Sequence, residues 1–281
     1  MWLETLGEIA KLLEPVGAEV LQKRWQDFSE RVVQAQAVPY HLQAIYAEIE
    51  ALRQGRPQSD IAILDHGCGP GSTLIWLAAR GYTNISGVDL DSDFGPQNRL
   101  MRVVVGHQRD CFLEYDGSHL PFADDAFDLV ISQQVLEHVP ASQFESYYAE
   151  EGRVLRSGGV AYHQVPHKLV PYDSHSRTWL LTVLPRRAAE TAMRVFGRAW
   201  PDHLHLRWPW IHMRMLRQHI GPAKNLSADR LQSLVDLPYY DGNRFVRLCL
   251  ARLCQLPFLG RFFALLFSSA VLLETRTVRR S

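Results

Sequence analysis

An apolar run that leads into three closely spaced glycines constrains this fold more than any other feature of the sequence. The run covers residues 61–64, and Gly67, Gly69 and Gly71 follow it. Glycine tolerates a positive φ and a close ligand, and it lets a following helix pack against the strand. The pattern predicts a buried strand, a tight turn and a helix over residues 72–80, the order of a nucleotide-binding βα unit. A tight turn without a ligand is the alternative interpretation.

Polar residues follow three further strand candidates. Residues 85–88 end in Asp89, about 20 residues beyond the glycine turn, where an acidic side chain suits the ribose hydroxyls of a nucleoside. Residues 111–115 lead into an Asp-Gly pair, and residues 127–132 stop at polar side chains. Strands and helices alternate over residues 61–165, which predicts a parallel sheet covered on both faces. Ligands of such sheets bind beyond the carboxyl ends of the strands.

Several motifs occur in order between residues 64 and 166. They are LDHGCGPGS at 64–72, GVDLD at 87–91, YDGSHLPFADDAFDLV at 115–130, SQQVLEHV at 132–139 and EGRVLRSGGVAYHQVP at 151–166. Together they resemble the class I S-adenosylmethionine-dependent methyltransferases, specifically the small-molecule group with a ubiquinone-biosynthesis-like core. The resemblance implies an α/β fold, with a Rossmann-like doubly wound sheet of seven strands, the last antiparallel. It also implies N-terminal helices and an insertion after the fifth strand.

The resemblance implies a role for each motif in binding S-adenosyl-L-methionine. Asp89 would hold the ribose hydroxyls, and Asp116 would meet the adenine amino group with Gly117 beside it. His66 stands where the family more often has a small or apolar residue. The residues expected around the methionine part and the transferred methyl group are Asp65, Gly67, Gly69 and Gly71, and then Ser132 and Gln133.

Glycine spacing and charge disfavour other ligand classes. The NAD fingerprint is Gly-x-Gly-x-x-Gly, whereas the glycines here fall as Gly-x-Gly-x-Gly, and no Lys follows the loop as in nucleoside triphosphatases. Thirty basic and thirty acidic residues cancel to a formal net charge of +0. Such a chain lacks the broad positive field expected of a protein that acts on nucleic acid, so we expect no nucleic-acid partner.

Cysteine spacing and the apolar segments bear on metals and location. No Cys-x-x-Cys pair occurs among the four cysteines, which are Cys68, Cys111, Cys249 and Cys254. We therefore expect free thiols and no metal. We interpret the sequence from Asp202 to His205 as a polar loop. The first residues do not read as a signal peptide, and no apolar run reaches the roughly 20 residues that span a bilayer. We expect a cytoplasmic protein, with peripheral contact to the inner face of the membrane as an alternative.

The chain divides into an N-terminal helical segment at 1–56 and a cofactor-binding domain at 57–281, with an insertion at about 168–208. The helical segment covers one face of the sheet or caps the substrate, and exposed aromatic side chains would favour the cap. The aromatic residues concerned are Trp25, Phe28 and Tyr40. The insertion is a candidate acceptor pocket because it follows the fifth strand.

Three arginines of the insertion, Arg187, Arg194 and Arg198, are expected to share a helix face that begins near Pro185. This face is either solvated or a contact for phosphate on a nucleotide sugar, a lipid-linked glycan or an anionic membrane. We expect a helix over residues 210–220 and a sixth strand within residues 225–237.

The C-terminal region is expected to supply the seventh strand and a covering helix. Residues 269–275 resemble the seventh strand of the family. Residues 245–267 are interpreted as a sheet-covering helix broken at Pro257. The alternative is an amphipathic interfacial segment with arginines at its polar edge, namely Arg247, Arg252 and Arg261.

Methyl transfer requires alignment of the acceptor with the methyl group, and a base if the nucleophile is a hydroxyl. Histidine suits the second task because its pKa lies near neutrality. His167 is our first candidate and His138 the second, ahead of His163 and His175.

We therefore expect a methyltransferase that acts on a small-molecule, saccharide or lipid-linked acceptor, at oxygen. A catalytically inactive binding or scaffold protein of the same fold is the alternative, followed by an NAD-dependent enzyme. The sequence leaves the oligomeric state open.

Overall fold

The computed structural model describes residues 2–35, 38–90, 93–173, 175–195, 197–233, 249 and 252–280. The chain folds as two compact units. The first unit comprises Met1–Gln133, Ala149–Tyr162 and Arg279–Ser281, and the second comprises Gln134–Tyr148 and His163–Val278. The chain passes from one unit to the other within α6 (Phe144–Val154) and again within β5 (Leu155–Val165).

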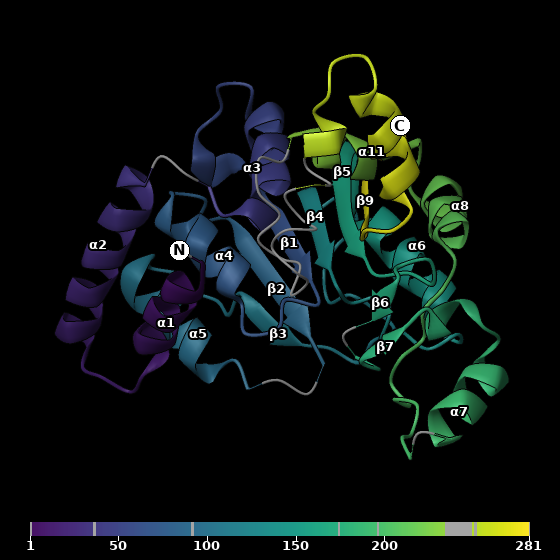
Figure 1. The fold of residues 1–281 in the computed structure, drawn as a ribbon. Helices are drawn as coiled ribbons and strands as arrows, with labels where there is room; N and C mark the ends of the chain where they lie inside the picture. Colours follow the sequence, from purple (N-terminus) through teal and green to yellow (C-terminus); the bar gives the residue numbers. More distant parts are fainter. Residues whose placement is uncertain are drawn as a thin grey trace. The chain divides into compact units, whose positions relative to one another are not determined.

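The first unit carries the N-terminal helices and the first four strands of the predicted cofactor domain (Figure 1). Its helices are α1 (Trp2–Leu13), α2 (Ala18–Gln34), α3 (Tyr40–Arg53), the short 3-10 helix η1 (Gln58–Asp60), α4 (Ser72–Ala79) and α5 (Gly95–Val104). Its strands are β1 (Ile63–His66), β2 (Ile85–Asp89), β3 (Phe112–Glu114) and β4 (Phe127–Gln133).

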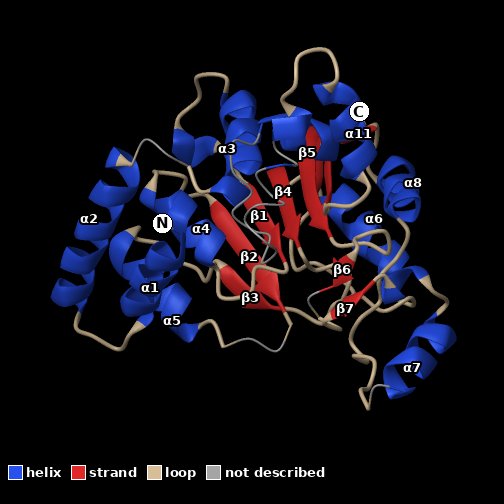
Figure 2. Ribbon diagram, in the orientation of Figure 1, coloured by secondary structure: helices blue, strands red, loops and turns tan. Residues whose placement is uncertain are grey.

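The second unit contains the insertion and the C-terminal elements (Figure 2). In the insertion, β6 (Tyr172–Asp173) and β7 (Thr178–Trp179) form an antiparallel pair. The 3-10 helix η2 (Leu181–Val183) and α7 (Arg186–Val195) follow. The remaining elements are α8 (Pro209–His219), β8 (Ala223–Asn225), α9 (Ser227–Ser233), α11 (Gly260–Ser268) and β9 (Leu273–Val278).

Within the described residues, seven strands form one sheet in the order β3-β2-β1-β4-β5-β9-β8. β1 pairs in parallel with both β2 and β4, and β2 pairs in parallel with β3. β8 and β9 run antiparallel to each other. The prediction of a Rossmann-like, mostly parallel sheet that ends in antiparallel strands is therefore confirmed.

β1 is an interior strand of the sheet, with β2 on one side and β4 on the other. All four of its residues are buried, and Leu64 lies in register with Ser86 on β2 and Val130 on β4. The same register sets Asp65 opposite Gly87. A side chain at position 87 would begin 2.8 Å from the Cys68 sulfur, so glycine is needed there for packing.

The helices α1 and α2 pack on helices of the first unit. Arg80, which follows α4, donates to the carbonyl of Val32 at the end of α2, and Arg99 of α5 donates to the carbonyl of Val16. Phe28 is 1% exposed, and Trp25 is half-buried. Neither is the exposed aromatic that a substrate cap would display. The side chain of Tyr40 lies outside the described residues.

Two expectations about the remaining strands need correction. A sixth strand is predicted within residues 225–237, but the strand that pairs with β9 is β8, which meets this range only at Asn225. The helix α9 follows it, and residues 234–237 lie outside the described residues. The antiparallel strand predicted at 269–275 is β9, which begins at Leu273 and runs to Val278. Strands as short as β8 carry too few residues for their apolar alternation to be read from the sequence. Asp91, at the end of the GVDLD motif, lies outside the described residues.

The arginine face predicted on α7 also differs. Arg187 and Arg194 lie on this helix and are exposed, but Arg198 lies beyond its end. The Arg198 guanidinium donates to the backbone carbonyls of Ser176 and Arg177, so it links the segment after α7 to the hairpin.

The C-terminal apolar segment only partly covers other structure. Gly260 and Ala264 of α11 are buried, and Arg261 donates to Asp229 of α9. Phe262, Leu265 and Leu266 remain more than half exposed, and so does Phe258 before the helix. The region from Phe245 to Leu248, with Arg247, lies outside the described residues. None of the helices described above combines the length and apolar composition of a membrane-spanning segment.

The glycine loop yields a stability prediction. A Cβ at Gly71 (φ +75°) would lie 2.4 Å from the Phe112 ring, whereas one at Gly106 (φ +79°) would meet nothing within 4 Å. Gly106→Ala measures only the cost of placing alanine in a left-handed backbone conformation. We expect it to lower the free energy of unfolding by about 1 kcal/mol. Gly71→Ala should lower it by about 2 kcal/mol or more, measured by urea unfolding. Equal losses of stability in the two variants would mean that the Phe112 ring moves aside without destabilising the fold.

Candidate functional site

The loop between β1 and α4 has the backbone that its glycines predict. Gly67, Gly69 and Gly71 all have positive φ, at 87°, 50° and 75°. The N–H groups of Gly67 and Cys68 donate to the carbonyl of Val88 at 2.8 and 3.0 Å. The loop is therefore held against the end of β2 in a conformation that few other residues adopt.

The Asp89 carboxylate closes this arrangement. Its Oδ2 accepts a hydrogen bond from the Gly69 N–H at 2.6 Å, and its Oδ1 accepts one from the Leu90 N–H at 2.7 Å. Each carboxylate oxygen keeps a further lone pair for another donor. The two residues lie 20 positions apart in the chain, and the structure brings them together as the motif predicts.

The space beside the loop suits a ligand. A Cβ at Gly69 would meet nothing within 4 Å, while the neighbouring positions 71 and 87 have no such room. A ligand would thus have room beside Gly69, close to the Asp89 carboxylate. These residues fit the cofactor that the sequence motifs imply.

Asp65, on β1, places a buried carboxyl group just before the same loop. It is 4% exposed, and burial raises its pKa to about 7, with the negative charge of Asp89 adding to the effect. A cationic ligand near this carboxyl would favour its ionised form. Asp65 is therefore suited to a cofactor that carries positive charge.

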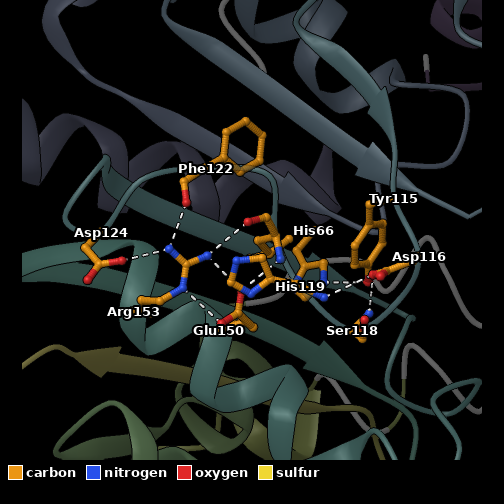
Figure 3. Close-up of polar contacts among 10 residues, drawn as sticks. His66, Tyr115, Asp116, Ser118, His119, Phe122, Asp124, Glu150 and Arg153 are labelled. Atoms are coloured by element: carbon orange, nitrogen blue, oxygen red, sulfur yellow. Dashed lines mark hydrogen bonds and ion pairs between the residues drawn. The ribbon is translucent and has the colours of Figure 1, made fainter.

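His66 connects the end of β1 to two other segments. Its Nδ1 lies 3.1 Å from Glu151 Oε1 of α6, and its Nε2 lies 2.8 Å from the Tyr115 hydroxyl (Figure 3 draws the His66 and Tyr115 side chains). His66 and Glu151 are both fully buried. In the tautomer with hydrogen on Nδ1, the ring donates to Glu151 and accepts from Tyr115. Sequence reasoning noticed His66 as a departure from the family but found neither partner.

Asp116 lies in the turn after β3. Its Oδ1 accepts from the N–H groups of Ser118 at 2.8 Å and His119 at 3.1 Å, as Figure 3 shows. These hydrogen bonds, first that from Ser118, lower the pKa of the Asp116 carboxyl to about 2. The side chain is exposed and ionised at neutral pH, and its second oxygen retains lone pairs for a donor such as an amino group. Gly117, with φ +79°, allows the turn.

Arg153 of α6 binds the backbone that directly follows this turn (Figure 3). Its Nη2 donates to the Leu120 carbonyl at 2.9 Å, and its Nη1 donates to the Phe122 carbonyl at 2.7 Å. The same guanidinium binds Glu150 and Asp124, and Glu150 accepts from the Leu120 N–H. Sequence reasoning missed both Arg153 and Glu150. Their spacing of three residues on a predicted helix was the only available signal, and it is common on exposed helices.

The end of β4 meets the N-terminal segment. Ser132 is buried, and the Gln133 amide donates to the carbonyl of His41 on α3 at 3.4 Å. The His41 ring in turn contacts the Trp2 ring edge-on, with centroids 4.3 Å apart. The segment before residue 57 therefore reaches the strand end at which the transferred methyl group is predicted.

The two histidines predicted to be catalytic lie in the second unit and differ in their surroundings. His167 is buried, its Nε2 donates to the Val271 carbonyl at 2.9 Å, and its Nδ1 accepts from the Leu169 N–H at 3.2 Å. Burial lowers the pKa of His167 to about 4. Both ring nitrogens are engaged by backbone, which argues against our first candidate for the base.

The side chain of His138 is 40% exposed, and its Nδ1 lies 3.3 Å from the His203 carbonyl. Burial is the main cause of its lowered pKa. The neighbouring Glu137 is fully buried, and burial raises the pKa of its carboxyl to about 7. The His138 ring packs edge-on against that of His175, with centroids 5.1 Å apart.

A cavity of about 230 Å³ lies in the second unit, largely between residues of the insertion. Lys168, Arg186 and Arg207 bring positive charge to its lining, which also includes Trp200 and Leu204. The Arg207 guanidinium is bound to backbone carbonyls and lies over an aromatic ring. Because Arg186 Nε donates to Glu190 at 2.7 Å, Lys168 is the cation best placed to meet a ligand.

Comparison with known proteins concerns mainly the first unit. The methyltransferase domain family matches residues 64–163. An uncharacterised methyltransferase of Mycolicibacterium vanbaalenii is 34% identical over 144 residues, which are 51% of this chain and 54% of that protein. Methyltransferase GfsG of Streptomyces halstedii is 33% identical over 101 residues, 34% of each chain. This chain thus spans about half or less of the length of these curated relatives.

Among solved structures, the geranyl diphosphate C-methyltransferase of Streptomyces coelicolor has a TM-score of 0.47 and 14% identity, over 91% of this chain and 82% of that one. A likeness of this size carries no information on the substrate. The family match runs from β1 to β5 and includes every predicted cofactor residue, while His167 and the insertion lie beyond it.

The raised pKa of Asp65 predicts a pH-dependent stability. Unfolded Asp loses its proton near pH 4, whereas the folded Asp65 keeps it until about pH 7. The free energy of unfolding should therefore fall as pH rises through this window. Asp65→Asn removes the titrating group. Urea unfolding should therefore show that the free energy of unfolding of the variant rises relative to that of the native chain from pH 5 to pH 8. The exposed control Asp60→Asn should show no such relative rise. If the stabilities of Asp65→Asn and the native chain change in parallel with pH, the raised pKa of Asp65 is refuted.

The Arg153 network predicts an effect on cofactor binding. Lys cannot reproduce two forked hydrogen bonds, so Arg153→Lys should loosen the turn that carries Asp116. We expect calorimetry to show roughly tenfold weaker binding of S-adenosylhomocysteine, or about 1.4 kcal/mol. Arg102→Lys, at the exposed ion pair with Asp110, is the matched control. Unchanged affinity in the Arg153 variant would mean that its hydrogen bonds do not contribute to cofactor binding.

Proposed function

We propose that this chain, which belongs to the class I S-adenosylmethionine-dependent methyltransferases through residues 64–163, transfers a methyl group to a small-molecule, saccharide or lipid-linked acceptor, at oxygen. The observation that carries the proposal is the Asp89 carboxylate, held by the Gly69 N–H beside the glycine loop. Asp65, Asp89 and Asp116 belong to one unit, where Asp65 and Asp89 lie near the carboxyl ends of β1 and β2 and Asp116 follows β3.

Each of the three carboxylates has a distinct task in the proposal. Asp89 accepts from the ribose hydroxyls with the lone pairs that its two backbone bonds leave. Asp116, ionised and exposed, accepts from the adenine amino group. The buried Asp65 supplies negative charge beside a cationic ligand.

When bound, S-adenosylmethionine supplies a methyl group on a positively charged sulfur, which is an activated donor. The chain then needs mainly to hold the donor and the acceptor in line. The glycine loop suits this role because its N–H groups and φ angles are already set by the end of β2. A loop that is already ordered loses little conformational entropy when the ligand binds.

The insertion supports a polar or anionic acceptor. Lys168 and Arg186 line a cavity whose remaining walls include Trp200 and Leu204. Aromatic and cationic side chains together suit a sugar that bears phosphate. Arg194 and Arg198 line a neighbouring hollow together with Glu190 and Asp202, so the charges of that hollow balance and the support comes from the cavity with Lys168.

The exposed face of α11 supports the inclusion of lipid-linked acceptors. Phe262, Leu265 and Leu266 on this helix, together with Phe258, are more exposed than is usual for large apolar side chains that lie so close together. Arg252 and Arg261 are exposed in the same segment and would favour an anionic surface. We infer peripheral contact with a membrane at this face.

A hydroxyl acceptor must lose its proton during or after transfer. Of the two predicted histidines, His138 has an exposed ring, whereas His167 uses both ring nitrogens on the backbone. His138 therefore remains the predicted group for this step.

Calorimetric titration tests the cofactor assignment. We expect S-adenosylmethionine and S-adenosylhomocysteine to bind and NAD not to bind. Asp89→Ala removes a charged acceptor of two hydroxyl hydrogen bonds, so affinity should fall by about 2–3 kcal/mol, or roughly 30- to 150-fold. Glu114→Ala is the matched control, because Glu114 lies in register with Asp89 at the end of β3 and is exposed.

Thermal unfolding of each variant separates loss of binding from loss of fold. Unchanged affinity in Asp89→Ala would refute the site. Turnover of bound donor with nucleotide sugars or lipid-linked glycans separates the proposed enzyme from an inactive protein of the same fold. Binding without turnover on any of these acceptors would favour the inactive scaffold.

A further inference from the structure

Glu137 has a buried carboxyl group beside two histidines. The side chain is fully buried, and neither carboxylate oxygen has a hydrogen-bond partner among the described residues. His138 Nε2 lies 3.9 Å from Glu137 Oε1, which is too far for a hydrogen bond. Leaving such a group unsatisfied is costly, and a native structure with one calls for an unseen partner such as an ion.

Two histidines converge on this carboxyl from separate segments. His138 follows Glu137 in the chain, and His175 comes from the turn between β6 and β7. One ligand atom from each of Glu137, His138 and His175 lies within 4.8 Å of the other two. All three residues belong to the second unit.

The far side of each imidazole is held in the manner of a metal ligand. His138 Nδ1 lies 3.3 Å from the His203 carbonyl, and His175 Nδ1 lies 3.3 Å from Asp173 Oδ1. With hydrogen on Nδ1, each ring keeps its Nε2 lone pair for an ion. Asp173 is itself oriented by the Ser176 N–H, which donates to its Oδ2 at 2.6 Å.

We propose that Glu137, His138 and His175 bind a divalent transition-metal ion of the zinc class. Two imidazoles and a carboxylate suit such an ion, whereas magnesium and calcium prefer sites made of oxygen ligands. Three protein ligands leave a coordination position open for water or a substrate oxygen, as in catalytic zinc sites. The ion's positive charge would also balance the buried Glu137 carboxylate.

Binding requires a modest contraction of the cluster. In a tetrahedral site with bonds near 2.1 Å, ligand atoms lie about 3.4 Å apart. Side-chain rotations that move the ligand atoms by roughly 1 Å would bring the three atoms to this separation. His175 is a quarter exposed, so its ring is less enclosed than the Glu137 side chain.

The ion would change the role of His138. A lone pair bound to metal cannot take a proton, so His138 would act as a ligand, and the ion would acidify an oxygen at its open position. The site rests on the geometry of the second unit and not on the proposed function, so it can be tested without cofactor or acceptor.

The experiment is equilibrium dialysis of the full chain against Zn²⁺, followed by elemental analysis, and titration with Co²⁺ as a spectroscopic probe. We expect stoichiometric zinc that millimolar Mg²⁺ does not displace, and a visible Co²⁺ absorption band that indicates low coordination. Glu137→Gln and His175→Ala should each weaken binding at least about 100-fold, and Asp173→Asn by roughly 10- to 100-fold.

The matched control is His219→Ala, since His219 also lies beside a glutamate, with its Nε2 3.4 Å from Glu145 Oε1. It should keep both zinc and the Co²⁺ band. If the buried Glu137 variant fails to fold, His175→Ala carries the test because its ring is partly exposed. A dialysed native chain without zinc, or His175→Ala with zinc bound as tightly as in the native chain, would overturn the proposal.

Discussion

The hydrogen bond from the Gly69 N–H to the Asp89 carboxylate is the interaction on which the candidate cofactor site depends. It joins the loop after β1 to the end of β2, 20 residues further along the chain. Parallel pairing of β1 with β2 brings the two carboxyl ends to the same edge, and the positive φ of Gly67 lets the loop turn there before the Gly69 N–H meets the carboxylate. The loop conformation and the orientation of Asp89 are therefore one structural feature.

Around this bond the chain buries polar groups that a purely structural turn would avoid. The His66 ring has partners for both nitrogens, in Glu151 and Tyr115, so its burial is compensated. Asp65 is different, because burial and the charge of Asp89 both disfavour its ionised form. Ionisation of Asp65 at neutral pH lowers stability in the free chain, and a cationic ligand would recover that free energy. Binding and stability are thus coupled at one residue.

Histidines of the second unit show how little residue type says about role. His167 was the first candidate for a base because it begins the insertion, yet backbone groups occupy both of its ring nitrogens. His138 and His175 face a buried glutamate instead. Spacing rules that search for nearby Cys and His pairs do not find this cluster, because its members come from segments 37 residues apart, from His138 to His175.

The sequence by itself determined the parallel core from β1 to β5, the glycine loop, and the positions of Asp89 and Asp116 at strand ends. These follow from local requirements: apolar runs must be buried, and a positive φ demands glycine. Only the tertiary structure decided that Arg153 holds the Asp116 turn, that β8 ends at Asn225, and that His138 and His175 meet. Such pairings depend on which distant segments pack together, and a side chain that donates to a distant backbone carbonyl leaves no periodic signal in the sequence.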